Sequence, residues 1–192
     1  MSKWFSSKLI ERGIIEREEE GLYQFGIQNG FIILLNVFTA FLIGLFTDKL
    51  LLVTVFTVSF MTLRSYTGGY HCDNKVICYI SSSLVLFIPI YTSYMMEIVP
   101  GYALFMILVV SVLIIAVLSP MNSKKRKLDS TEKKHFGKRA RVLLVLQLVI
   151  LLILYGVANR ELVYAVYSSI YLIALFMLIG KVSLQIQLHM DE

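Results

Sequence analysis

Six apolar runs follow one another along the chain and constrain its fold more than any other feature. They cover roughly residues 25–46, 50–63, 76–96, 101–118, 142–158 and 162–179. A membrane-spanning helix needs about 20 apolar residues, with about 17 as the lower limit, and five of the six runs meet or nearly meet that length. Only 16% of the 192 residues are charged, whereas a typical soluble domain has about a quarter. The sequence therefore predicts an all-α, polytopic membrane protein: a bundle of six transmembrane helices.

The second run is short for a membrane span. Leu50 to Leu63 is fourteen residues, which cover only about 21 Å at about 1.5 Å per residue. To cross the membrane, this helix must extend through Arg64 to Tyr66, with the arginine side chain reaching the surface. Alternatively, the "GGYHC" segment that follows dips below the membrane surface. Both alternatives place residues 64–78 at a membrane boundary.

The segment before the first run alternates charged and bulky apolar residues. Over residues 2–20 this pattern is typical of an amphipathic helix lying in the membrane interface. A soluble amphipathic helix packed on the bundle is the alternative. Charged residues interrupt the first apolar positions, so we expect no cleavable signal peptide.

We therefore divide the chain into an N-terminal interfacial segment and a six-helix transmembrane domain with a short tail. The interfacial segment covers 1–21, the transmembrane domain 22–181 and the cytoplasmic tail 182–192. A cytoplasmic basic loop at 122–141 lies within the transmembrane domain.

The distribution of lysine and arginine predicts the orientation. If all six runs cross and the N-terminus is cytoplasmic, only Lys49 and Arg160 of the 18 basic residues face outward, and nine lie in 122–141. Cytoplasmic loops of membrane proteins carry such an excess. Both termini and residues 64–78 are therefore expected on the cytoplasmic side. The net charge of +5 is explained by this topology, and we expect no nucleic-acid partner.

The stretch "RSYTGGYHCDNKVIC", residues 64–78, gathers the reactive side chains of the chain. On one unbroken helix, His71 and Cys78 would lie about 10.5 Å apart along the axis, whereas a thiol–imidazole hydrogen bond needs about 3 Å. A catalytic dyad therefore requires the backbone to turn. Gly68-Gly69 can provide the turn, and Asp73-Asn74 are good N-cap residues for the next helix. Cys78 would then lie near that helix's N-terminus, which stabilises a thiolate.

Other interpretations of these residues are open. Cys72 competes with Cys78 but directly follows His71, and adjacent side chains diverge. A lone cysteine in an apolar helix is commonly only a small hydrophobic residue. A metal site would have His71 and both cysteines but no fourth ligand at conventional spacing. We expect no metal or cofactor, and we expect His135 and His189 to be solvated.

The pattern R-x4-G-x-H-x6-C, formed by Arg64, Gly69, His71 and Cys78, resembles the signature of the accessory gene regulator B (AgrB) family. These are membrane cysteine endopeptidases of quorum sensing in Gram-positive bacteria. "EEEGLYQFGIQNGF" and "LSPMNSKKRK" resemble the start of the family's first span and the end of its fourth. The likeness covers nearly the whole chain.

The resemblance implies roles for these residues. Cys78 would be the nucleophile and His71 its general base, cutting a short autoinducer propeptide through an acyl-enzyme thioester and promoting its cyclisation to a thiolactone or lactone. Arg64 would bind a substrate carboxylate, stabilise the oxyanion, or only anchor the span in the membrane. Gly68 and Gly69 would shape the turn. Asp73 would orient the imidazole or cap the helix.

The family's propeptides carry an amphipathic N-terminus, an internal Cys or Ser and an acidic tail. The basic loop, with Lys124, Lys125, Arg126 and Lys127, would hold that tail or attract anionic lipid. Family members work as homodimers in a bacterial cell membrane. A small-peptide transporter and a non-catalytic membrane scaffold are the alternative functions. The transporter is disfavoured because ionisable residues are nearly absent from the centres of the runs.

Overall fold

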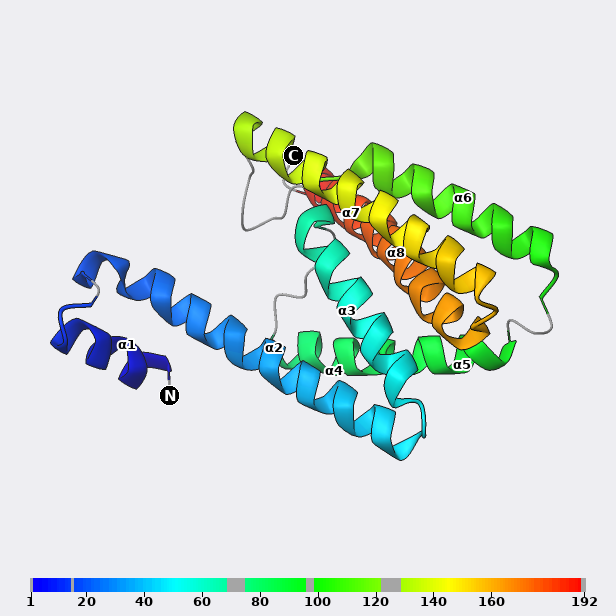
Figure 1. Ribbon diagram of the computed structural model, residues 1–192. Helices are drawn as coiled ribbons and strands as arrows, with labels where there is room; N and C mark the ends of the chain where they lie inside the picture. The colour runs from blue at the N-terminus through cyan, green and yellow to red at the C-terminus, as the bar shows by residue number, and fades with distance from the viewer. Residues whose placement is uncertain (1, 15, 69–74, 96–98, 122–128, 191–192) are drawn as a thin grey trace. The chain divides into compact units, whose positions relative to one another are not determined.

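The computed structural model describes residues 2–14, 16–68, 75–95, 99–121 and 129–190, and the regular elements in these ranges are all helical (Figure 1). The chain divides into two compact units, Met1–Thr39 and Ala40–Glu192, with the boundary inside helix α2 (Glu20–Phe46). Six segments of the described chain are helical, long and apolar enough to cross a membrane. The predicted all-α fold with six candidate spans and an N-terminal helix is thus confirmed.

Helix α1 (Ser2–Glu11) is shorter than the sequence predicts. We expect one helix over residues 2–20, but Gly13 takes a left-handed conformation with φ 67°. The amides of Gly13 and the next residue donate back to carbonyls of the last turn, in the pattern of a Schellman cap. The 3-10 turn η1 (Arg17–Glu19) then leads into α2.

A small polar cluster joins α1 to the start of α2. The Ser6 hydroxyl is buried and donates to the Glu20 carboxylate at 3.2 Å. The Gln24 side-chain amide donates to both, at 3.1 Å to Ser6 and 3.0 Å to Glu20. These bonds fix the N-terminal helix against the beginning of the first span.

Helix α8 (Arg160–Met190) is the centre of the second unit. It packs against α3 (Leu50–Thr67), α5 (Phe87–Met95), α6 (Gly101–Leu118) and α7 (Ser130–Gly156) (Figure 1). Its residues 165–170, AVYSSI, are all buried. Lipid tails are as apolar as these helices, so close packing at small side chains drives their association. Over residues 165–170 the helix is therefore buried on every side.

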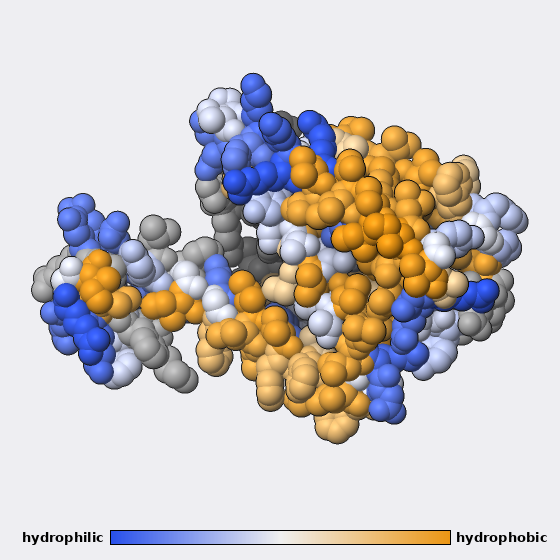
Figure 2. Space-filling model, in the orientation of Figure 1, coloured by the Kyte–Doolittle hydropathy of each residue, from blue (hydrophilic) through white to orange (hydrophobic). Residues whose placement is uncertain are grey.

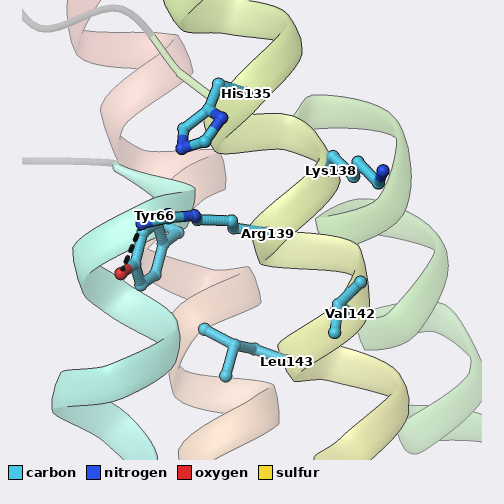
Figure 3. Close-up of a pocket in the computed structure, with 6 residues that line it drawn as sticks. All are labelled: Tyr66, His135, Lys138, Arg139, Val142 and Leu143. Carbon is cyan, nitrogen blue, oxygen red and sulfur yellow. Dashed lines mark hydrogen bonds between the residues drawn. The ribbon is translucent and has the colours of Figure 1, made fainter.

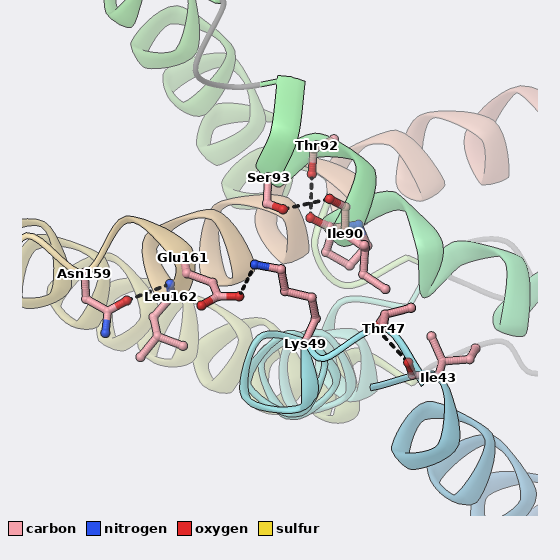
Figure 4. Close-up of polar contacts among 10 residues, drawn as sticks. Ile43, Thr47, Lys49, Ile90, Thr92, Ser93, Asn159, Glu161 and Leu162 are labelled. Atoms are coloured by element: carbon pink, nitrogen blue, oxygen red, sulfur yellow. Dashed lines mark hydrogen bonds and ion pairs between the residues drawn. The ribbon is translucent and has the colours of Figure 1, made fainter. Parts of the chain in front are cut away.

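Two polar contacts add specificity to this packing. The hydroxyls of Thr92 on α5 and Ser168 on α8 lie 3.1 Å apart, with Thr92 labelled in Figure 4. The Gln147 side-chain amide on α7 donates to the Ser59 carbonyl of α3 at 2.7 Å. Such bonds set the rotation of one helix against another in the membrane interior.

The third span is a pair of helices rather than one. The sequence predicts a continuous run over 76–96, but a single residue, Leu86, separates the end of α4 (Lys75–Val85) from the start of α5. Pro89 lacks an amide hydrogen, so the Val85 carbonyl, four residues earlier, loses its helical partner. The proline therefore accounts for the interruption at Leu86.

Two other helices extend beyond the apolar runs. Helix α3 continues through Tyr66 to Thr67, as a full span requires. Helix α7 begins at Ser130, so residues 130–141 are helical rather than part of a loop. An Asp129–Glu132 capping box starts it there, in which the Asp129 amide donates to the Glu132 carboxylate at 3.2 Å.

The surface of the second unit is apolar between two hydrophilic ends (Figure 2). Large apolar side chains are exposed along α6 and α7, including Phe105, Leu113, Val117, Val145 and Leu152. In water such a surface would be unfavourable, but in a bilayer it contacts lipid tails. The surface is therefore that of a multi-pass membrane protein.

One of the hydrophilic ends carries an ion pair between Lys49 and Glu161, with Nζ 2.8 Å from Oε1 (Figure 4). It links the start of α3 to the first turn of α8. The hydrogen bond to Glu161 raises the pKa of Lys49 above its ordinary 10.5, against a smaller opposing effect of partial burial.

Candidate active site

The end of α3 is built around Arg64 and Gly68. Gly68 has φ 73° and follows the last helical residue, where its amide donates to the Arg64 carbonyl at 3.2 Å. The Arg64 side chain closes the same turn, because Nη1 donates to the Gly68 carbonyl oxygen at 2.6 Å. Its guanidinium also lies 5.4 Å from the ring centroid of Phe176 on α8. Arg64 thus joins the end of α3 to the central helix.

Gly68 is required by space as well as by conformation. The Met121 amide, just after α6, donates to the Thr67 carbonyl at 3.0 Å. A Cβ atom built on Gly68 would lie 2.8 Å from the Met121 carbonyl oxygen, closer than real Cβ contacts. A side chain at this position would therefore both strain the backbone and displace the segment after α6.

The same segment packs against the first turns of α7. A Cβ atom on Gly137 would lie 3.1 Å from Cδ of Pro120. The ends of α3, α6 and α7 therefore meet at Gly68, Pro120 and Gly137. The "LSPMNSKKRK" motif includes Pro120, but nothing in the sequence indicates that it contacts the glycine turn.

Cys78 is the fourth residue of α4 and is partly buried. This position at the helix N-terminus agrees with the prediction. An electrostatic interaction links Arg64 on α3 with Cys78 on α4. The structure thus places Arg64 and Gly68 at the end of α3 and Cys78 in the first turn of α4.

The other predicted site residues lie outside the described parts of the chain. Gly69, His71, Cys72 and Asp73 belong to residues 69–74. Lys124, Lys125, Arg126 and Lys127 belong to residues 122–128. Because α3 ends at Gly68 in a left-handed conformation, Arg64 and Cys78 are not on one continuous helix. The proximity of His71 to Cys78 stays a prediction.

Two remaining observations concern other titratable groups. His135 is exposed, as predicted, with its ring 6.2 Å from that of Phe136. The His189 side chain lies outside the described part. Among the described residues, no group of three His, Cys, Asp or Glu side chains could hold a metal ion.

These features define a class of protein: a multi-pass, all-helical membrane protein with a cysteine in the first turn of one span and an arginine in the last turn of the span before it. The family model of accessory gene regulator B matches residues 2–186, and the chain belongs to this family. Comparison with curated proteins and with solved structures gave no match. The protein is accordingly a membrane cysteine endopeptidase that processes an autoinducer propeptide in quorum sensing. Its substrate is an AgrD-type propeptide.

Proposed function

We propose that Cys78 is the nucleophile and His71 the general base of this endopeptidase. The observation that carries the assignment is the position of Cys78 in the first turn of α4, together with its electrostatic interaction with Arg64. His71 is seven residues before Cys78 and follows a turn that begins at Gly68. Cys72 adjoins His71 directly, which disfavours it as the nucleophile.

The reaction proceeds through a thioester. His71 takes the proton of Cys78, and the thiolate attacks the carbonyl carbon at the cleavage site. The oxyanion intermediate collapses, the C–N bond breaks, and the imidazolium gives its proton to the leaving amine of the C-terminal tail. His71, neutral again, then takes the proton of an internal thiol or hydroxyl of the propeptide, which attacks the thioester. The ring closes as a thiolactone or lactone, and the Cys78 thiolate is released.

For Arg64 we propose a positioning role together with charge stabilisation. The bond to the Gly68 carbonyl and the stacking on Phe176 hold the guanidinium within the protein. These contacts favour that role over a snorkelling anchor. In this role its charge would stabilise the thiolate or the oxyanion. Gly69 would continue the turn, and Asp73 would cap α4 or orient the imidazole.

The cleavage assignment is tested by coexpressing the chain with its propeptide and following tail release by gel shift. Cys78→Ala and His71→Ala are expected to abolish release because the nucleophile and base are lost. Cys72→Ala, the matched control, is expected to retain it. Tail release by Cys78→Ala would show that another residue attacks the peptide.

We further propose that both termini and the active site face the cytoplasm and that the enzyme is a homodimer. Segment 1–21 would lie in the interface between membrane and water. The excess of basic residues supports the orientation. The basic residues Lys124, Lys125, Arg126 and Lys127 would hold the acidic tail of the propeptide or attract anionic lipid. The family match replaces the transporter and scaffold hypotheses with an enzyme.

A further inference from the structure

A pocket of about 410 Å³ lies between the end of α3 and the first turns of α7 (Figure 3). It is lined by Tyr66, His135, Lys138, Arg139, Val142 and Leu143. The five residues from α7 recur at spacings of three and four, so they share one face of the helix. The volume falls in the range of ligand sites, about 300–1,000 Å³. A ligand the size of a lipid headgroup therefore fits.

The lining is cationic at one end and apolar at the other. Arg139 reaches across to Tyr66, with Nη1 3.5 Å from the phenol oxygen and the guanidinium 5.7 Å from the ring centroid (Figure 3). Lys138 and His135 add positive or titratable groups. Val142 and Leu143 lie one turn further along α7, about 6 Å along the axis. The pocket is therefore amphipathic along the helix.

The carboxylates nearest in sequence are used elsewhere. Asp129 and Glu132 form the capping box at the start of α7. Within the part of the chain that the structure describes, the recorded ion pair is Lys49–Glu161, and neither Lys138 nor Arg139 pairs with a carboxylate. The cations of the pocket thus have capacity for an external anion.

The pocket also lies where α7 changes from charged to apolar. Arg141 is the last charged residue before "VLLVLQLVILLILYG". In a membrane helix this change marks the level of the lipid headgroups. An acidic peptide would match the cations alone, whereas a lipid matches both the cations and the apolar end.

We propose that this α3–α7 pocket binds an anionic glycerophospholipid. The phosphate would accept charge-assisted hydrogen bonds from Lys138 and Arg139, and the glycerol and the start of the acyl chains would contact Val142 and Leu143. The inference depends on the membrane placement of α7 and not on the proposed catalytic residues, so its test has a readout separate from cleavage.

The test places the purified full chain in nanodiscs of equal parts phosphatidylglycerol and phosphatidylcholine. Native mass spectrometry then measures the ratio of the two lipids retained on the protein. Lys138→Gln with Arg139→Gln is expected to lower the phosphatidylglycerol preference by about fivefold for each cation removed. Lys133→Gln with Lys134→Gln, the matched control, removes the same charge from the same helix outside the pocket and is expected to leave the ratio unchanged.

An unchanged ratio in the pocket variant, or an equal loss in the control, would overturn the proposal. If the ratio is unchanged while the pocket variant binds an acidic peptide more weakly, the occupant is a peptide and the lipid site is wrong. Should the double variant fail to elute as a folded species, Arg139→Gln and Arg139→Lys are compared. The lysine, which keeps the charge, is expected to retain more of the lipid preference.

Discussion

At the scale of single residues, Gly68 connects local conformation with the proposed chemistry. Its left-handed φ ends α3, its carbonyl accepts the Arg64 side chain, and its missing Cβ admits the Met121 backbone. These three constraints meet at one position because the turn before His71 is packed between helix ends. The sequence identifies the paired glycines as a turn, but the contact with Met121 joins residues far apart in the chain.

Gly68→Ala is expected to destabilise the protein by about 1–3 kcal/mol, since it imposes backbone strain at positive φ together with the steric conflict. The same substitution should also lower the rate of propeptide cleavage, because the turn that begins at Gly68 leads to His71. Thermal unfolding in detergent and tail release measure the two effects. Gly30→Ala is the control, because a Cβ there meets nothing within 4 Å. Equal stability of the two variants would contradict the structural role of Gly68.

At the scale of elements, the helices are held by packing on α8 and by a few polar contacts at defined places. The Lys49–Glu161 pair joins the α2–α3 turn to α8 at the hydrophilic end carrying both residues. Its side chains are 26% and 41% exposed, so it ranks with surface pairs, which contribute about 0.2–1 kcal/mol.

The raised pKa of Lys49 makes that contribution dependent on pH. The charged lysine is favoured in the folded state, so the stabilisation is fully present below the ordinary pKa of 10.5 and is lost as pH rises through the raised value. Lys49→Met is expected to lower the melting temperature at pH 8 and to have a smaller effect near pH 11.5. Lys181→Met, which removes an exposed lysine, is the control. If Lys49→Met lowered the melting temperature equally at both pH values, the result would argue against the ion pair.

At the scale of the whole molecule, the apolar surface of the second unit and the six spans predict two hydrophilic ends on opposite sides of a membrane. Asn159 lies in the turn between α7 and α8, near Lys49–Glu161, whereas Cys78 starts α4. The basic residues favour a cytoplasmic Cys78 and an external Asn159.

The orientation is checked by cysteine labelling in intact cells. With Cys72→Ala in both variants, a membrane-impermeant maleimide is expected to label Asn159→Cys in a Cys78→Ser background and to miss Cys78 itself. Permeabilised cells should allow both reactions. Labelling of Cys78 in intact cells would reverse the assigned orientation.

The sequence by itself determined the membrane class, the six spans, the motif and the family, because hydrophobic run length and motif spacing are local properties of the chain. Only the tertiary structure decided that α8 is the central helix, that Arg64 bonds the Gly68 carbonyl, and that α3 and α7 form an amphipathic pocket. It also located the starts of α5 and α7, which depend on Pro89 and on the Asp129–Glu132 cap. These features result from contacts between residues distant in sequence or from competition at helix ends, and neither is expressed in hydrophobic periodicity.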